Sequence, residues 1–241
     1  MGSVFRYISR RQEYFLKEEG WRKEEQGARE SRFALGNGFL GIRGVLEEHP
    51  QGAQPGTYIA GLYDKATAQV RELVNLPNPL SFKVVANEEK LGMSATGVLD
   101  HQRVLGMRKA MLFRRTIYLN RFSRRVKYES LRFLSRKDKG LGVMRVQVSP
   151  LDRDAILVAQ AGVDVSVANK GVLSEGRKNH FSIEDVQRLE DIRYLFYQAR
   201  INGYWVCRGQ DNRCASRYRR RNLSAGCPLA GVVKTLSGTQ E

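Results

Sequence analysis

The sequence is poor in the residues that hold metals or form disulfides. It contains three cysteines and three histidines among 241 residues. The number of cysteines is odd, no two of them have CxxC spacing, and no histidine lies at a metal-ligand interval from them: Cys207, Cys214 and Cys227. We therefore predict reduced, unligated thiols and no metal site.

Long apolar runs are also absent. No stretch approaches the ~20 apolar residues that span a membrane. The segment Met1–Arg11 lacks the uninterrupted apolar region of a secretory signal. The sequence thus predicts no membrane span and a cytoplasmic location.

Acidic residues are scarce relative to basic ones, with 25 Asp and Glu against 41 Lys and Arg and a formal charge of +16. Such an excess is typical of proteins that bind nucleic acid or an anionic surface. However, the basic residues are scattered, and none lies in an RNP1-like block, a GXXG clamp or a zinc-finger spacing. Nucleic-acid binding remains an alternative that the motifs do not favour.

A glycine-rich stretch from Glu30 to Gly44 organises the chain. Its four glycines are Gly36, Gly38, Gly41 and Gly44. Asn37 and Gly38 form a strong hairpin-turn signal because both tolerate positive φ. Apolar residues alternate into this turn and resume after it, so we predict a hairpin whose backbone another segment approaches closely. The glycine spacing does not match a phosphate-binding loop.

Short β-rich segments recur along the chain, which predicts an all-β sandwich. They include Thr57–Tyr63, Leu80–Val85, Ala110–Leu119, Arg125–Phe133, Gly140–Val148 and Val163–Ala168. In the fourth segment the apolar positions shift phase between Tyr128 and Leu131, which predicts a β-bulge. Residues 181–199 have both helical spacing and alternation, followed by Asn202-Gly203 as a hairpin turn. We predict mainly strand there, with an amphipathic helix as the alternative.

Several ordered blocks of residues carry a family resemblance. The blocks are Glu30–Gly44, Gly56–Asp64, Glu72–Pro77, Arg103–Arg108, Leu112–Arg115, Glu129–Phe133 and Ser149-Pro150. Together they resemble glycoside hydrolase family 65, which contains the maltose, trehalose and kojibiose phosphorylases, from about residue 20 to about residue 206. One block departs from the family pattern, because Gly106 replaces an aspartate and leaves Arg108 without that carboxylate.

The resemblance implies a β-supersandwich of the galactose-mutarotase-like type, incomplete at its C-terminal end. In the family this domain precedes an (α/α)6 barrel, where a glutamic acid protonates the glycosidic oxygen while inorganic phosphate attacks with inversion. Phosphate is a co-substrate, and no cofactor or metal is implied. The implied partners are an α-linked glucosyl disaccharide, bound through the barrel, and a second copy in a homodimer.

We accordingly expect no catalytic, cofactor-binding or metal-binding residue in this chain, which we predict to be truncated before the barrel and inactive alone. Adjacent carboxylates such as Glu47-Glu48 and Glu184-Asp185 would point apart on a strand, so we interpret them as solvated charges. The mixed-charge lead-in that contains Glu18 is interpreted in the same way. We interpret the three histidines as isolated surface or loop residues: His49, His101 and His180.

From Cys207 the strand pattern and the family pattern both stop, and arginines crowd between residues 208 and 221. We therefore predict a family-like sandwich over residues 1–206 and a basic, unrelated-looking tail over residues 207–241. The tail is either a binding segment for an anionic partner or an out-of-frame translation. Two further functions stay open: a carbohydrate-binding module that uses Tyr58, Tyr63 and Trp205 as stacking platforms, and a nucleic-acid binder that uses residues 217–221.

Overall fold

The computed structural model describes most of the chain from residue 14 to residue 238. The described ranges are 14–65, 71–93, 97–153, 155–170, 177–178, 180–189, 192–199, 205–211, 217–218 and 229–238. Beyond Asn169, side chains are described only at His180 and Phe181. No helix within these ranges is long and apolar enough to cross a membrane.

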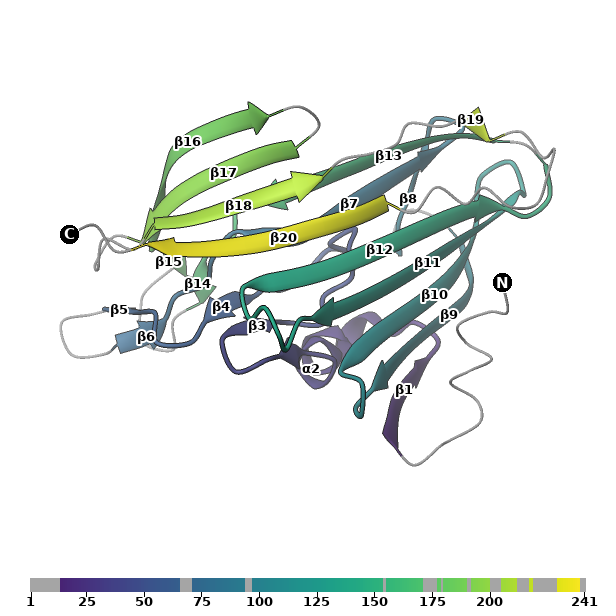
Figure 1. Cartoon of the computed structure of the whole chain (residues 1–241). Coiled ribbons are helices and arrows are strands. Elements are labelled where there is room, and N and C mark those ends of the chain that lie inside the picture. Colours follow the sequence, from purple (N-terminus) through teal and green to yellow (C-terminus); the bar gives the residue numbers. More distant parts are fainter. Residues whose placement is uncertain are drawn as a thin grey trace.

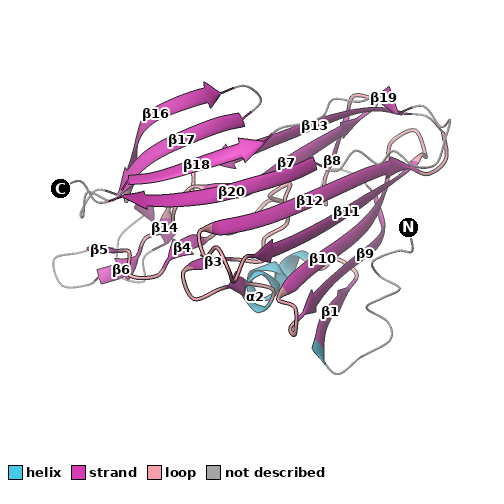
Figure 2. Ribbon diagram, viewed as in Figure 1, coloured by secondary structure: helices cyan, strands magenta, loops and turns pink. Residues whose placement is uncertain are grey.

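The predicted all-β class is confirmed, and one large antiparallel sheet dominates the structure (Figures 1 and 2). Its strands, in spatial order, are β1 (Phe15–Glu19), β9 (Gly97–Gly106), β10 (Met111–Leu119), β11 (Arg125–Leu134), β12 (Leu141–Pro150), β20 (Leu229–Gly238), β18 (Trp205–Asp211), β17 (Ile192–Ala199) and β16 (Phe181–Leu189). The described ranges also contain a short α-helix, α2 (Gln26–Arg32), preceded by the 3-10 turn η2 (Lys23–Glu25).

A second, smaller sheet contributes the other layer of the sandwich. It runs in the order β19 (Arg217–Tyr218), β13 (Ala155–Asp164), β7 (Asn78–Ala86) and β8 (Glu89–Leu91). The core between the layers includes Phe82 from β7 and Leu112 and Tyr128 from the large sheet. The rings of Phe82 and Tyr128 lie 6.4 Å apart. This face-to-face packing is that of a β-sandwich, as expected for the predicted supersandwich.

In the described part of the chain, three small sheets lie beside the sandwich. They are β2 (Leu35–Gly36) with β3 (Leu40–Ile42) and β4 (Thr57–Ile59), β5 (Tyr63–Lys65) with β6 (Arg71–Leu73), and β14 (Asn169–Lys170) with β15 (Arg177–Lys178). The connection between β3 and β4, residues 43–56, is here called the long loop.

The predicted Asn37-Gly38 hairpin is confirmed as the turn between β2 and β3. Gly38 has φ of +87°, a value that favours glycine. The side-chain oxygen of Asn37 accepts hydrogen bonds from the backbone N–H groups of Phe39 and Leu40. Its amide nitrogen donates to the carbonyls of Ser135 and Lys139, at 2.7 and 2.9 Å. Asn37 therefore closes its own turn and ties it to the β11–β12 connection.

The close backbone approach predicted for this stretch occurs at Gly44 but not within the hairpin. A Cβ atom placed on Gly44 would lie 2.6 Å from the carbonyl oxygen of Phe33, whereas Cβ atoms on Gly36, Gly38 and Gly41 would meet nothing within 4 Å. The Gly44 N–H also donates to the Glu30 carbonyl at 2.7 Å. The C-terminal end of α2 thus passes directly over the start of the long loop.

The bulge predicted in β11 is wrong. The strand pairs with β10 from Arg125 to Leu134 without a register shift, and its buried residues alternate without interruption. The inward set includes Ser130 and Arg132, and the apolar Leu131 and Phe133 lie on the opposite, partly exposed face. The phase shift in the sequence therefore marks buried polar residues rather than an extra residue.

The strand prediction for residues 181–199 is confirmed by the antiparallel pair β16 and β17, while Asn202-Gly203 lies outside the described residues. The prediction that the strand pattern ends at Cys207 is wrong, since β18 continues to Asp211 and β20 pairs with both β12 and β18. Cys207 lies in β18, whereas Cys214 and Cys227 are outside the described residues. The division of the chain after residue 206 stays a prediction.

Replacing Gly44 with alanine tests the close approach. We expect Gly44→Ala to destabilise the fold by about 1–3 kcal/mol, as overpacking does, because the added methyl group meets rigid backbone. The measurement is the free energy of unfolding in urea. Gly41→Ala is the matched control, since its Cβ has open space, and an equal loss in the two variants would contradict the explanation.

Candidate functional site

A polar groove opens between the long loop and the segment from Asp164 to Asn169. Its cavity volume is about 780 Å³, within the range of roughly 300–1,000 Å³ found for small-molecule sites. Among its lining residues are Arg43, His49, Gln54, Tyr58, Asn75 and Asp164. The groove brings together residues that are up to 126 positions apart in the sequence (43 to 169), so no single sequence block predicts it.

Two asparagines fix one wall of the groove. The Asn75 side chain accepts a hydrogen bond from the Thr57 N–H at 3.0 Å and donates to the Pro55 carbonyl at 2.9 Å. The Asn169 side chain accepts from the Asn75 N–H and donates to the Leu73 carbonyl, both at 2.8 Å. These four bonds use the amides to join three segments of backbone, which makes this wall rigid.

His49 lies in the long loop, as predicted, but it is not isolated. Its Nε2 is 2.8 Å from Nδ2 of Asn78, and its Nδ1 is 3.4 Å from a carboxylate oxygen of Asp164. Because the asparagine nitrogen can only donate, Nε2 accepts and the imidazole proton is placed on Nδ1, facing Asp164. Burial lowers the pKa of His49, and the Asp164 carboxylate offsets this only in part. The imidazole is therefore neutral at pH 7.

Among the described groove side chains, Tyr58 and Gln54 keep polar groups available, and the buried Nε of Arg43 also has no hydrogen-bond partner. Neither the Tyr58 hydroxyl nor the Gln54 side-chain amide has a hydrogen-bond partner among the described residues. Gly56 lies beside the tyrosine, since a Cβ atom there would be 2.7 Å from both Cε2 of Tyr58 and Cδ of Arg43. The missing side chain of Gly56 thus provides the space that the Tyr58 ring and Arg43 occupy.

A buried ion cluster holds the long loop against the large sheet. Arg114 of β10 has no exposed side-chain surface. Its Nη1 is 2.6 Å from Glu47 and 2.5 Å from Glu48, and its Nη2 is 2.7 Å from Glu48. The interpretation of these carboxylates as solvated is wrong, because they lie in a turn, where the strand rule that neighbours point apart does not apply. The side chains of Glu184 and Asp185 lie outside the described set.

Two neighbouring arginines hold the same loop through its backbone. Arg103 of β9 donates to the carbonyl of Gly44 at 2.6 Å, and Arg132 of β11 donates to that of Val45 at 2.7 Å. Three adjacent strands therefore each supply one buried arginine to residues 44–48. The loop segment that follows, which begins with His49, forms the edge of the groove.

Glu18 extends this cluster toward the N-terminal strand. It is buried, with 4 % exposure, and it accepts hydrogen bonds from Arg103, at 2.5 Å, and from Arg29 of α2. His101 is also buried and hydrogen-bonds to Thr116 at 2.9 Å. The predictions of a solvated Glu18 and a surface His101 are therefore wrong, because paired partners on adjacent elements allow both side chains to be buried.

The third histidine is likewise buried between partners. His180 has Nδ1 2.5 Å from Asp64 and Nε2 2.8 Å from Glu72. Asp64 and Glu72 are directly opposite each other in the β5–β6 ribbon. His180 therefore joins this ribbon to the start of β16, and the prediction of an isolated surface residue is wrong.

Comparisons with known proteins agree with this fold. The model for the glycosyl hydrolase family 65 N-terminal domain matches residues 16–235. This chain belongs to that family. The family 65 match includes β20, which supplies a strand near the middle of the large sheet.

Individual relatives of this family 65 chain are disaccharide phosphorylases. Kojibiose phosphorylase from Caldanaerobacter subterraneus subsp. tengcongensis is 32 % identical over 70 % of this chain and 22 % of its own length. Nigerose phosphorylase from Lachnoclostridium phytofermentans is 33 % identical over 57 % of this chain and 18 % of its own. The chain spans about a fifth of the length of these relatives.

A solved structure shares the fold. Described as a candidate kojibiose phosphorylase from the human microbiome, it matches with a TM-score of 0.73 and 17 % sequence identity. The match covers 93 % of this chain and 30 % of the solved one.

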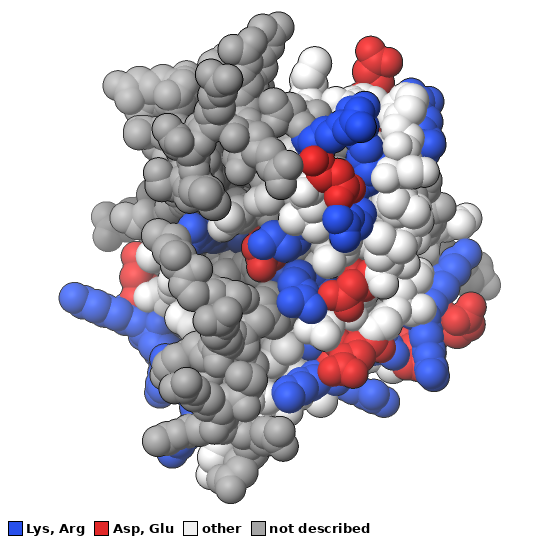
Figure 3. Space-filling view, turned by 90° about the vertical axis from the view of Figure 1, so that its right-hand side faces the viewer, with Lys and Arg blue, Asp and Glu red and all other residues white. Residues whose placement is uncertain are grey.

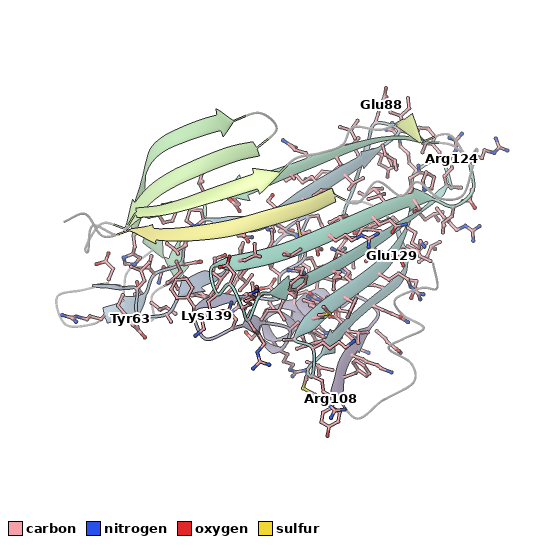
Figure 4. All side chains as sticks on the ribbon, viewed as in Figure 1. Tyr63, Glu88, Arg108, Arg124, Glu129 and Lys139 are labelled. Carbon is pink, nitrogen blue, oxygen red and sulfur yellow. The ribbon has the colours of Figure 1, made fainter. Side chains whose placement is uncertain are left out.

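The structure separates the three aromatic residues that the sequence grouped as stacking platforms. Tyr58 lines the groove, whereas Tyr63 is 49 % exposed on the β5–β6 ribbon (Figure 4). Only the backbone of Trp205 is described. Arg108, which lacks the family carboxylate, instead places its guanidinium 4.8 Å from the centre of the Tyr14 ring.

On the face shown in Figure 3, the basic excess of the sequence does not form a surface of one sign. Arg103, Arg114 and Arg132 are buried in the ion cluster. On the face shown in Figure 3, basic and acidic side chains alternate. Partly exposed ion pairs also offset basic charges locally: Arg115 lies 2.8 Å from Asp100, and Lys127 lies 3.0 Å from Glu129.

Replacing Arg114 with methionine tests the ion cluster. We expect Arg114→Met to lower the free energy of unfolding by about 3–5 kcal/mol, because it leaves two buried carboxylates without their shared cation. The neighbouring Arg115 supplies a matched control, since it pairs with Asp100 on the partly exposed face. Arg115→Met should cost less than about 1 kcal/mol. Urea unfolding of both variants measures the difference, and equal losses would refute a special role for Arg114.

The same cluster predicts a dependence of stability on pH. Burial alone would raise the pKa of Glu47, but Arg132, Arg114 and Ser130 lower it from 4.5 to about 2. Burial alone would also raise the pKa of Glu18, but His101, Arg103 and Arg29 lower it to about 2. Because the unfolded chain takes up protons first, the stability from these groups is full above pH 4.5 and is lost as pH falls toward about 2.

We expect these two carboxylates to add no pH dependence between pH 7 and about 5, and below that to lower the free energy of unfolding by up to about 1.4 kcal/mol per pH unit for each carboxylate. The lowered pKa values of His49 and His101 add a separate loss of stability as pH falls below 6.5. Urea titrations across this range measure the slope. Glu47→Gln should be less stable at pH 7 and should have a shallower acid slope than the parent chain. A Glu47→Gln variant with an unchanged slope would rule out this carboxylate as a source of the acid sensitivity.

Proposed function

We propose that this chain acts as the non-catalytic N-terminal domain of an inverting α-glucosyl disaccharide phosphorylase, and that it is inactive by itself. The match to the family 65 N-terminal domain over residues 16–235 is the observation that supports this role. The relatives named for kojibiose and nigerose phosphorolysis extend well beyond the matched segment. We therefore assign the reaction to the segment of the complete enzyme that corresponds to the unmatched part of these relatives.

The chemistry of the described carboxylates is in keeping with this proposal. A glycosidic general acid must hold its proton near neutral pH, which requires a raised pKa. The arginines around Glu18 and Glu47 instead lower the pKa of each carboxyl to about 2. Arg114 also lowers the pKa of Glu48 against the effect of burial. These groups serve as permanent charges in an ion cluster and not as proton donors.

The proposed role is architectural. The sandwich braces the catalytic barrel, contributes to a homodimer, and lends a loop to the rim of the sugar site. We place the protein in the cytoplasm, where an α-linked glucosyl disaccharide and inorganic phosphate are the co-substrates of the complete enzyme. Nucleic acid is not a proposed partner, because the mixed charges of Figure 3 offer no continuous basic track on that face.

An assay of phosphorolysis tests the proposal. The purified 241-residue chain, incubated with phosphate and kojibiose, nigerose, maltose or trehalose, should release no glucose 1-phosphate above a blank. The kojibiose phosphorylase from Thermoanaerobacter brockii, 33 % identical over 65 % of this chain, is the positive control. Phosphate-dependent release of glucose 1-phosphate by the chain alone would overturn the non-catalytic role.

A further inference from the structure

The groove has the construction of a ligand site, with a fixed frame and unused polar groups. Asn75 and Asn169 are fully engaged in holding the wall. By contrast, the hydroxyl of Tyr58 and the amide of Gln54 have no partner among the described residues. A rigid wall combined with a few unengaged donors and acceptors is the usual basis of small-molecule recognition.

We propose that this groove is a binding site for a neutral saccharide of about two sugar units, with Tyr58 as its stacking platform and Gln54 as a hydrogen-bonding side chain. The choice of α-glucosyl disaccharides as ligands rests on the proposed function, but the site itself rests on the groove. Binding here is separate from phosphorolysis, since it needs no acid catalyst and no phosphate.

The charges of the groove favour a neutral ligand over an anion. Arg43 and Asp164 are lining residues of opposite sign. Arg43 already donates to the Gly27 carbonyl at 3.1 Å and contacts the Glu30 carboxylate at 3.4 Å. Asp164 accepts hydrogen bonds from Ser166 and faces His49. Lys83 acts electrostatically on His49 and Asp164 without lining the groove. A phosphate group would thus meet one compensated cation and one carboxylate.

Tyr58 has the chemistry that a sugar-stacking platform requires. The residue is partly exposed at the groove, and its Cε2 edge and hydroxyl lie beside Gly56, where a Cβ atom would be 2.7 and 2.8 Å from them. A pyranose ring has a face of C–H bonds and a rim of hydroxyl groups. An aromatic ring with a polar tip complements both features, because its face contacts the C–H bonds while the hydroxyl bonds the rim.

The size of the groove also fits. Its volume of about 780 Å³ exceeds what a single monosaccharide fills, and it lies in the range of roughly 300–1,000 Å³ for sites that enclose small ligands. The groove is bounded by the long loop, which the buried arginines hold through Gly44, Val45, Glu47 and Glu48. The ligand would therefore bind to a preformed groove.

Calorimetric titration of the full 241-residue chain with kojibiose, nigerose and maltose tests the site. We expect dissociation constants in the millimolar range for at least one disaccharide. Tyr58→Ala should weaken binding at least about tenfold, or about 1.4 kcal/mol. Tyr63→Ala is the matched control, because it removes an exposed tyrosine outside the groove, and its affinity should stay within about twofold of the parent. Inorganic phosphate and glucose 1-phosphate should not compete.

Circular dichroism and urea unfolding identify folded variants. If Tyr58→Ala does not fold, Gln54→Ala takes its place, since this loop side chain is exposed, and it should weaken binding at least about threefold. No heat with any of the disaccharides in the tens of millimolar would overturn the inference, as would equal losses in Tyr58→Ala and Tyr63→Ala or competition by phosphate. A chain that binds no sugar and releases no glucose 1-phosphate refutes this site alone, whereas glucose 1-phosphate release refutes the non-catalytic role.

Discussion

The salt bridge that Arg114 makes with Glu47 and Glu48 is the constraint on which much of the structure depends. All three charges are removed from water between the large sheet and the long loop. A buried charge is tolerated only where its partner is in place, so sheet and loop must form together. Arg103 and Arg132 reinforce this coupling because they bind backbone carbonyls of the loop, and Arg132 also pairs with the Glu47 carboxylate at 3.2 Å.

This arrangement divides the interior of the sandwich into two parts. One part is an ordinary apolar core in which Phe82 of β7 meets Tyr128 of β11. In the other, neighbouring inward positions of β9, β10 and β11 carry arginines. A second sheet would present apolar side chains to this face, whereas the irregular loop presents carbonyls and carboxylates. The arginines of the polar part bind these groups and so allow the sheet to support the loop. The groove edge at His49 follows directly from that support.

Features of the fold could be predicted from the sequence where they depend on residues that are close together in the chain. The Asn37-Gly38 hairpin and the recurrent strands were predictable because turn chemistry and alternation act between neighbours in sequence. The burial of Glu18, Glu47 and His101 was not predictable, because each depends on a partner on another strand or loop, 85, 67 and 15 residues away respectively. In β11 the same effect produced a false bulge: buried Arg132 interrupted the apolar pattern while the backbone continued unchanged. The family resemblance supplied the fold class but could not indicate the groove, whose walls come from separate blocks.

The position of β20 in the large sheet has a consequence for the order in which the sheet can assemble. β12 finds its second neighbour only at residues 229–234, although the strand itself spans Leu141–Pro150. During synthesis, the edge of β12 therefore remains unpaired while roughly eighty further residues are added, a period that lasts several seconds at typical elongation rates. The strands from β16 to β18 likewise await β20 before they join the rest of the sheet. An open strand edge of this kind is a template for pairing with other chains. Until β20 is synthesised, the nascent protein is therefore prone to aggregation, and chaperones or a low protein concentration favour the pairing of β12 with β20.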